Sequence, residues 1–463
     1  MPFNSFEDYP MSWRPKREEL EKPYYLSLAG LLEQEIVEGR LQAHTKLPPQ
    51  RELADFLDFN VSTITRAYKL CELKGLLYAV TGKGTFVASG ICAGDTFIEK
   101  KSRCIEMGMI KPFYETNDMV LEAARAILKR GDAAGLLEYN NPLGTDRQLC
   151  AAVCWLQRHG VRVEKRGVLI AAGAQNALSV ILLSLFQAGD KIAVDEFTYT
   201  NFKGLANLLQ IQLIAVRGDN YGMLPEALEA LCKNTEIRGA YLMPTCSNPT
   251  GAFMPQDRRK ELAEVMRRFN LLLIEDDIYS FLAPQGTVSF FSFMPKQTLH
   301  ICSLSKSLCA GMRVAFVAFP EQYRDRLVSG MLHMNLKTVA LNAEIMAELI
   351  ESGKADEIVQ KKIELAVRRN QIYEKFFQKE EGNIARFFHW LKLPSGLTGE
   401  EAELLALQNG VHVLGSHRFA QGGGEKAAFL RLSVVSPDTE AELMRGLKVL
   451  RNMLQEVPVS LLV

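Results

Sequence analysis

Three short polar clusters follow three apolar runs in the middle of the chain, at nearly equal spacing. Asn248 stands in Ser-Asn-Pro-Thr-Gly, Asp276 and Tyr279 stand in Glu-Asp-Asp-Ile-Tyr, and Lys306 stands in Ser-Leu-Ser-Lys-Ser. The first two clusters are 28 residues apart and the last two are 30 apart, measured at Asn248, Asp276 and Lys306. One strand-plus-helix unit has about this length. The spacing therefore predicts an amide, a carboxylate, a phenol and an amine at one edge of a sheet.

These four groups are the ones that pyridoxal phosphate requires from a protein. A lysine whose pKa is lowered by burial can bond covalently to the cofactor's aldehyde, which is the catalytic role expected of Lys306. A carboxylate such as Asp276 keeps the pyridine nitrogen protonated, so that the ring accepts electrons. The amide of Asn248 and the phenol of Tyr279 can hold the ring's phenolate oxygen.

A further set of residues could hold the cofactor's phosphate. Gly173, Ala174 and Gln175 form a turn of mostly small residues that opens a helix, and such a helix N-terminus attracts anions. Ser303 and Arg313, on either side of Lys306, can add hydroxyl and guanidinium donors. Taken singly, the clusters have ordinary explanations as a turn, a helix cap or an acyl-transfer nucleophile. Their combination in this order favours a cofactor site.

Short, nearly all-apolar runs separated by helical stretches predict the sheet that positions these groups. Such runs are typical of a parallel sheet buried on both faces, and ligands bind at the carboxyl ends of its strands. The runs are Val168–Ala172, Lys191–Val194, Leu213–Val216, Gly239–Met243, Leu271–Ile274, Leu299–Cys302 and Val314–Ala318. The expected fold class is α/β, with a mainly parallel seven-stranded sheet and a small C-terminal α/β subdomain.

The N-terminal part has a different pattern. Leu28, Leu32 and Ile36 form one apolar helix stripe, and Pro49 suits the start of a second short helix. A third helix has its apolar stripe at Ile64, Ala67, Tyr68 and Cys71. Strands over 76–80 and 85–88 follow, joined around Thr-Gly-Lys-Gly, which predicts a hairpin with a basic tip. Three helices and a hairpin in this order form a winged helix-turn-helix.

The outer face of the third helix carries the groups that duplex DNA attracts. It shows Ser62, Thr63, Arg66 and Lys69, whose hydroxyls and cations suit phosphates and base edges in a major groove. Residues 60–88 contain four cations and one acid, whereas residues 23–89 contain seven of each. A helical protein-interaction module with a solvated polar face is the alternative. The placement of cations on one face and at the hairpin tip favours DNA.

From Leu47 to Val87 the sequence resembles the GntR class of winged-helix regulators. The motifs are L-P-x-x-R-x-L-A, then V-S-x-x-T-x-x-x-A-Y-x-x-L, then G-x-G-T-F-V, with a shifted threonine pattern and Pro49 in place of the usual serine. The resemblance implies DNA contacts from a set of residues on the helix-turn-helix and the wing. They are Arg51, Ser62, Thr63, Arg66, Lys83 and Gly84, and the helix face described above adds Lys69.

From about Tyr139 to Ser436 the chain resembles the fold-type-I aminotransferases. The resemblance gives Lys306, Asp276, Tyr279 and Asn248 the cofactor roles described above, and makes Ala174, Gln175, Ser303 and Arg313 phosphate ligands. It implies that Tyr199 stacks on the ring and that Tyr139 reaches the phosphate of a neighbouring subunit. It also implies that Arg431, in Leu-Arg-Leu-Ser, binds the α-carboxylate of a substrate or effector.

Two departures from that family are visible. Asp-Glu-Phe-Thr-Tyr replaces the usual Glu-x-Pro-x-Tyr before Tyr199, and Gln148-Leu149 replaces the usual Leu-Arg pair after Gly144. The fusion of both units resembles the MocR regulators, which implies a homodimer in which each reader crosses to its partner. The expected boundaries are 1–22 for an N-terminal extension, 23–89 for the reader, 90–116 for a linker, 117–320 for the cofactor-binding large domain and 321–463 for a small subdomain.

The composition limits the partners and the cellular compartment that are expected for the chain. Fifty-four basic and 54 acidic residues cancel, so net charge names no partner. Nine cysteines without a Cys-x-x-Cys pair argue against a disulfide framework or a zinc site and favour a reducing cytoplasm. The longest apolar runs are too short to span a bilayer, which predicts no membrane association. No metal ligand set is expected.

Three functions remain open. The chain could be a regulator that senses an amino-acid-like effector, or the cofactor itself, through pyridoxal phosphate. It could be a working aminotransferase with an accessory DNA-binding unit. It could be a regulator with a vestigial site, although the presence of all the expected groups weighs against this. The expected partners are double-stranded operator DNA and a small-molecule effector.

Overall fold

The computed structural model describes residues 11–37, 40–41, 45–73, 76–80, 84–87, 104–139, 141–378, 384–422 and 427–456. The chain divides into two compact units, Met1–Ser102 and Arg103–Val463. No helix in the described ranges is long and apolar enough to cross a membrane.

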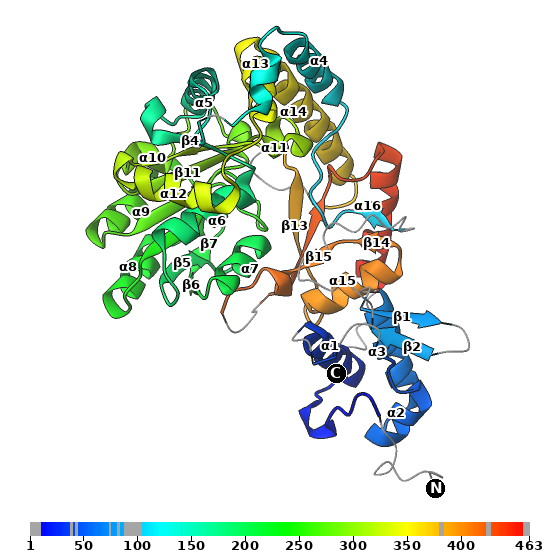
Figure 1. Cartoon of the computed structure of the whole chain (residues 1–463). Helices are drawn as coiled ribbons and strands as arrows, with labels where there is room; N and C mark the ends of the chain where they lie inside the picture. The colour runs from blue at the N-terminus through cyan, green and yellow to red at the C-terminus, as the bar shows by residue number, and fades with distance from the viewer. Residues whose placement is uncertain are drawn as a thin grey trace. The chain divides into compact units, whose positions relative to one another are not determined.

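The first unit has the predicted order of elements, drawn in blue in Figure 1. They are α1 (Tyr24–Val37), α2 (Gln50–Leu57), α3 (Val61–Leu73), β1 (Leu77–Val80) and β2 (Gly84–Val87). The apolar stripe of α1 and that of α3 are both buried, as the periodicity predicts: Leu28, Leu32, Ile36, Ile64, Ala67, Tyr68 and Cys71. The winged helix-turn-helix is confirmed.

Two backbone positions shape this unit. Asp58, in the turn between α2 and α3, has a φ of 55°, a left-handed conformation that Asp tolerates better than most residues. Gly84 opens β2 with a φ of 118°, and a Cβ atom there would lie 2.9 Å from Lys46 Cε. The Lys46 strand segment lies beside the hairpin, because Leu47 N donates to Thr85 O at 2.9 Å. A lysine that sequence reasoning missed therefore stands at the wing.

The second unit is built on a seven-stranded sheet, and every predicted apolar run contributes one strand. The order is β4-β12-β11-β10-β9-β5-β6, and all neighbours are parallel except β12, which is antiparallel to both of its neighbours. The strands are β4 (Val168–Ala171), β5 (Lys191–Asp195), β6 (Gln212–Val216), β9 (Gly239–Leu242), β10 (Leu272–Asp276), β11 (Thr298–Ser303) and β12 (Ala315–Ala318).

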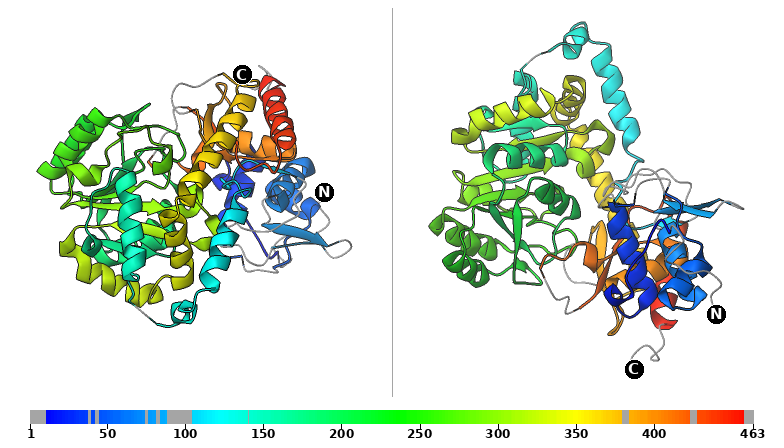
Figure 2. Two further views of the ribbon diagram at one scale, coloured as in Figure 1. Left: turned by 90° about the horizontal axis from the view of Figure 1, so that it is seen from above. Right: turned by 60° about the horizontal axis from the view of Figure 1, so that its bottom comes forward.

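Both faces of this sheet are covered, which explains the unbroken apolar runs. In β4, Leu169 packs in one core cluster with Leu178 of α6 (Ala174–Leu185), whereas Val168 and Ile170 pack in another with Trp155 of α5 (Asp146–Arg158). Alternate side chains of a strand point to opposite faces. Helices therefore lie on each side of the sheet, as the green and yellow segments of Figure 2 show.

The C-terminal part carries a smaller antiparallel sheet, β13 (Phe388–Lys392), β16 (Phe429–Ser433) and β15 (Leu414–Gly415), in the order β13-β16-β15. Beside it β3 (Ile105–Glu106) pairs in parallel with β14 (Val411–His412). Residues from 104 onward, within the segment that the sequence predicts as a linker, thus belong to the folded second unit. Figure 1 shows β13, β15 and α16 gathered in orange and red.

The remaining helices of the second unit connect and cover these sheets. They are α4 (Asn117–Leu128), α7 (Thr200–Leu208), α8 (Pro225–Asn234), α9 (Gln256–Arg268), α10 (Phe290–Phe293), α11 (Leu304–Ser307), α12 (Arg324–Asn335), α13 (Ala340–Glu351), α14 (Lys354–Tyr373), α15 (Gly399–Gln408) and α16 (Glu440–Glu456).

Candidate functional site

The carboxyl ends of β9, β10 and β11 bring the three predicted clusters together. These strands are neighbours, with Glu275 opposite Leu242 on one side and His300 on the other. Asp276 is the last residue of β10 and Ser303 the last of β11, so both begin the loops that carry the polar groups. The equal spacing in sequence therefore becomes a common sheet edge.

Asp276 lies almost fully buried at this edge. Its Oδ2 accepts a hydrogen bond of 2.8 Å from the phenol of Tyr241 on β9, a residue that sequence reasoning missed. Its Oδ1 has no partner among the described residues. Burial raises the pKa of Asp276 to about 7, although the Tyr241 hydrogen bond opposes the shift. A cationic group placed at Oδ1 would restore the carboxylate.

Lys306, on the short helix α11, has its amine inside the site and donates to the carbonyl of Ile110. Burial lowers the pKa of Lys306 to about 7, and the nearby cations Arg431, Lys362 and Arg313 add to the effect. The neutral amine, which is the nucleophilic form, is therefore accessible near neutral pH.

Lys362 on α14 is a second lysine that sequence reasoning missed. It is fully buried, and its Nζ lies 3.3 Å from the carbonyl oxygen of Lys306 and 2.7 Å from that of Leu308. A cation at the end of α11 fixes the backbone that carries Lys306.

Two of the predicted phosphate ligands, Ser303 and Arg313, meet around one hydroxyl. Arg313 Nη1 donates to Ser305 Oγ at 3.1 Å, and Ser303 Oγ lies 3.2 Å from the same atom. Gly173, at the N-terminus of α6, has a φ of 88°, and a Cβ atom there would collide with the Arg313 guanidinium. The glycine thus allows Arg313 to reach the first turn of α6, where Ala174 and Gln175 lie. Ser305, between two residues that the sequence did single out, completes this cradle.

The three tyrosines predicted for the site differ in burial and in hydrogen bonding. Tyr279 is buried, and its hydroxyl has no partner among the described residues. Tyr199 accepts a hydrogen bond of 3.0 Å from Asn201, and burial, reinforced by the charge of Asp276, raises its pKa to about 12. Tyr139, in contrast, is 89% exposed.

Arg431, on β16 of the small sheet, reaches into the same site. Its Nη1 donates to Asn248 Oδ1 at 2.7 Å and its Nη2 donates to the carbonyl of Gly108. Its guanidinium carbon lies 4.9 Å from the centre of the Phe419 ring. Burial lowers the pKa of Arg431 to about 10. Because Asn248 uses its oxygen on Arg431, its amide nitrogen is left to donate to a ligand.

Gly108 and Ile110, in the segment that was expected to be a linker, supply carbonyl oxygens to Arg431 and Lys306. Backbone carbonyls leave no signal in the residue types, so sequence reasoning could not find them.

Buried polar atoms of the site that lack a partner show whether its residues suit pyridoxal phosphate. Within the described ranges, four buried atoms of the site lack a hydrogen-bond partner, and an unpaired buried polar group costs about 1–3 kcal/mol. They are Asp276 Oδ1, Tyr279 Oη, Gln175 Oε1 and Arg431 Nε. Asp276 Oδ1, Tyr279 Oη and Arg431 Nε match a pyridinium nitrogen, a phenolate oxygen and a carboxylate, whereas the amide oxygen of Gln175 is an acceptor and does not match a phosphate.

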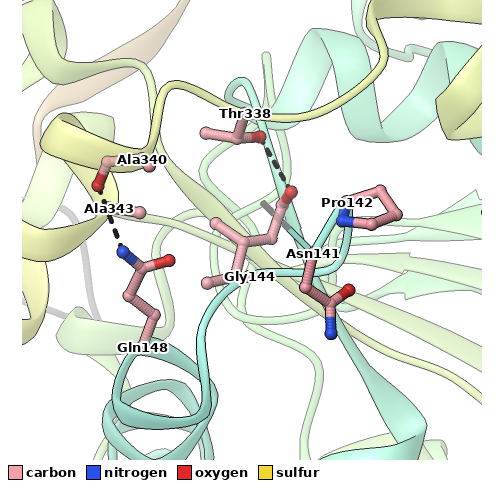
Figure 3. A pocket seen from close by; sticks show the side chains of 8 residues that line it. Asn141, Pro142, Gly144, Gln148, Thr338, Ala340 and Ala343 are labelled. Atoms are coloured by element: carbon pink, nitrogen blue, oxygen red, sulfur yellow. Dashed lines mark hydrogen bonds between the residues drawn. The ribbon is translucent and has the colours of Figure 1, made fainter. Parts of the chain in front are cut away.

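A narrow crevice lies between residues 141–148, β4 and the start of α13, as Figure 3 shows. Gln148, one of the two departures, closes it: its Nε2 donates to the carbonyl of Ala340 at 3.1 Å and to Glu344 Oε2 at 3.0 Å. Thr338 Oγ1 donates to the carbonyl of Ile170 at 2.8 Å across the crevice. Gln148 also forms a capping box with Thr145 at the start of α5, so this departure has a structural role.

The predicted DNA face is partly described. Arg51, Ser62, Arg66 and Lys69 are exposed and Thr63 is half-buried. The guanidinium of Arg66 lies 4.0 Å above the ring of Tyr25 on α1. Gly84 has the positive φ described above, and Lys83 lies outside the described residues. Tyr25 is an aromatic support for Arg66 that the helix periodicity did not reveal.

Arg66→Ala is expected to weaken operator binding by about 1–3 kcal/mol if Arg66 contacts a base edge. The side chain is exposed, so the free energy of unfolding should change little. Mobility-shift titrations on operator and on random duplex DNA measure the effect, with Lys69→Ala as the comparison. A base contact lowers operator binding selectively; unchanged affinity for both duplexes would show that the recognition face is wrongly assigned.

Two family models match the chain. That of the bacterial regulatory proteins of the gntR family matches residues 24–87, and that of aminotransferase class I and II matches residues 104–450. The combination is the architecture of the MocR class. The chain belongs to the aminotransferase class I and II family and carries a gntR-family reader at its N-terminus.

Two curated relatives, one named as a regulator and one as an enzyme, are similar to this chain. The uncharacterized HTH-type transcriptional regulator YdeF of Bacillus subtilis is 40% identical over 461 residues, covering 99% of this chain and 100% of the relative. The 2-aminoadipate transaminase of Thermus thermophilus is 30% identical over 335 residues, covering 69% of this chain and 81% of the relative.

Solved structures agree on the fold of the second unit. The α-aminoadipate aminotransferase LysN of Thermus thermophilus, complexed with N-(5'-phosphopyridoxyl)-L-leucine, superposes with a TM-score of 0.69 at 24% identity, covering 78% of this chain and 93% of that one. An archaeal alanine:glyoxylate aminotransferase gives a TM-score of 0.70 at 22% identity, covering 77% and 91%.

Proposed function

We propose that the chain is a transcriptional regulator whose reader binds operator DNA and whose second unit binds pyridoxal phosphate and senses an amino-acid-like effector. The observation that carries this proposal is the presence of both machineries in one chain: an exposed recognition helix, and a lysine site in which buried polar atoms of Asp276, Tyr279 and Arg431 have no partner among the described residues. The cytoplasmic location predicted from the cysteines belongs to the same proposal.

Each group of the site has a proposed task. Lys306 bonds covalently to the cofactor's aldehyde, and Asp276, oriented by Tyr241, holds the protonated ring nitrogen. Tyr279 and Asn248 donate to the phenolate oxygen, and Tyr199 stacks on the ring. The first turn of α6, with Ser303, Ser305 and Arg313, binds the phosphate. When bound, the cofactor supplies a reactive carbonyl and an electron-accepting ring.

Arg431 supports the choice of effector. Its charge is buried, and its hydrogen-bond partners within the described residues are the neutral oxygens of Asn248 and Gly108. Glu106 and Glu403 act on Arg431 only through space, and a buried charge without a directly bonded opposite charge is unfavourable. The carboxylate of a ligand would supply that charge in the bidentate geometry that a guanidinium favours. Since Lys306 lies in the same site, the ligand that fits carries both a carboxylate and an amine.

Two alternatives remain candidates. Pyridoxal phosphate itself could be the signal, with its occupancy alone changing the affinity for DNA. The chain could also be an active aminotransferase, which its similarity to the 2-aminoadipate transaminase favours. Incubating the purified protein with amino acids and keto acids separates these functions. A regulator changes its cofactor spectrum without sustained product formation, whereas steady turnover would favour the enzyme.

A homodimer is part of the proposal, because Tyr139 is expected to act in the neighbouring subunit. Exposed apolar side chains cluster near it: Leu137 is 79% exposed, and Leu336 and Val339 are exposed as well. The two segments are joined, since Lys337 Nζ donates to the carbonyl of Glu138 at 2.8 Å. A second copy of the chain would bury this apolar surface.

Cofactor uptake by the protein without cofactor is expected to rise with pH through about 7. The bond to the aldehyde requires neutral Lys306 and the ring requires anionic Asp276, and both groups have a pKa of about 7. Absorbance titrations with pyridoxal phosphate between pH 6 and 8 measure the midpoint. Tyr241→Phe should move it upward, because the hydrogen bond that favours the Asp276 anion is lost; the exposed Tyr221→Phe is the control. Uptake that falls with rising pH would contradict this assignment.

A further inference from the structure

Residues 11–20 are folded against the reader, although the gntR match begins at residue 24. Trp13, Pro15 and Leu20 are buried. Trp13 Nε1 donates to Glu35 Oε2 on α1 at 2.9 Å, and Ser12 donates to the carbonyl of Lys46 beside the wing. This N-terminal segment is therefore fixed at two separate places on the winged helix-turn-helix.

A third attachment lies at the turn between α2 and α3. Arg17 Nη1 lies 2.6 Å from Asp58 Oδ2, and the Arg17 guanidinium carbon lies 5.1 Å from the centre of the Phe59 ring. The ring of Phe59 also stacks on that of Tyr24, at the start of α1, with the ring centres 4.7 Å apart. One cation thus contacts both the charged and the aromatic residue of this turn.

The position of Asp58 gives this contact a consequence for DNA binding. The second helix of a helix-turn-helix enters the major groove with its N-terminal residues at the bases. Asp58 precedes the first residue of that helix, Val61, by three positions, and its side chain is 89% exposed. With the helix in the groove, a carboxylate at this turn would lie near the phosphate backbone and repel it, unless a cation neutralises the charge.

We propose that the N-terminal segment 11–20 is a working part of the DNA reader, in which Arg17 neutralises Asp58 and holds the helix-turn-helix turn beside the operator phosphates. Arg17 is in this account a positioning residue, and the inference rests on operator binding by the reader. The Asp58 backbone requires a left-handed conformation, which Asn adopts as readily as Asp. Asp58→Asn therefore removes the charge and keeps the turn.

A double-mutant cycle tests the proposal with the full-length protein. Arg17→Ala is expected to lower operator affinity about 3- to 10-fold at low salt, and less at high salt, because the exposed carboxylate is screened. Asp58→Asn alone should leave affinity equal or raise it. The double variant should return to near the wild-type value, since no carboxylate remains to be neutralised.

Controls separate this effect from unfolding and from a direct phosphate contact. The Arg17–Asp58 pair is exposed, so thermal unfolding should be unchanged. Lys16→Ala removes a cation from the same segment that pairs with Glu19 and should have a smaller effect. If Arg17→Ala binds normally, or if Asp58→Asn fails to rescue it, the proposal is wrong. Failure of the wild-type protein to bind any operator would instead refute the proposed function.

Discussion

Lys306→Ala is expected to abolish the covalent attachment of pyridoxal phosphate completely. Burial and the neighbouring cations lower the pKa of the Lys306 amine to about 7, so that its neutral, reactive form is present near neutral pH. The other buried lysine of the site, Lys362, has its Nζ engaged with two carbonyl oxygens and cannot replace it. Some non-covalent affinity should remain, because Ser305 and Arg313, which are proposed to bind the phosphate, are unchanged.

Borohydride reduction followed by intact mass measurement checks this result. The wild-type protein should gain the mass of one reduced cofactor per chain, and Lys306→Ala should gain none. The exposed Lys260→Ala is the matched control and should behave as the wild type. A reduced adduct on the Lys306→Ala protein would show that another lysine is the attachment point.

Arg431→Ala is expected to remove the effect of the effector on operator affinity. Typical coupling between two sites is about 1–3 kcal/mol, or roughly 5- to 150-fold in affinity, and a ligand shifts an equilibrium only by its differential affinity for the two states. Without the guanidinium, a ligand carboxylate loses its bidentate partner. Cofactor attachment and operator binding without effector should remain, since Lys306, Asp276 and the reader are intact.

Arg431→Lys is an informative companion, because it keeps the charge and loses the planar fork. We expect it to recover only part of the effector response in operator titrations. The side chain also holds Asn248 and the carbonyl of Gly108, so intact cofactor absorbance is the required control for folding of the site. An Arg431→Ala protein with a normal effector response would indicate that occupancy by pyridoxal phosphate is the signal.

The sequence predicted those parts of the site that depend on residue type and spacing. Lys306, Asp276 and Asn248 were found because each follows a buried strand, and parallel strands end at one edge. Seven apolar runs predicted seven strands, all confirmed, although nothing in the residue types of β12 distinguishes its antiparallel direction.

Other contributions could not be predicted because they arise from tertiary contacts. In the sequence, Tyr241 is one more residue of an apolar strand, and only the structure shows that its phenol donates a hydrogen bond to Asp276. The carbonyls of Gly108 and Ile110 belong to no motif. The segment before Pro23 has no periodic pattern, and its place on the reader depends on three contacts with residues far away in the sequence. Local periodicity does not record such pairings.

The central claim is that a ligand at the lysine site changes the affinity of the reader for DNA. The direct measurement is a mobility-shift titration of the wild-type operator with three forms of the protein: without cofactor, loaded with pyridoxal phosphate, and loaded and supplied with a panel of amino acids. We expect one of these amino acids to shift the operator dissociation constant of the loaded protein roughly 5- to 150-fold. The same amino acid should leave the operator dissociation constants of the protein without cofactor and of Lys306→Ala unchanged. Equal operator affinity in all three forms would contradict it.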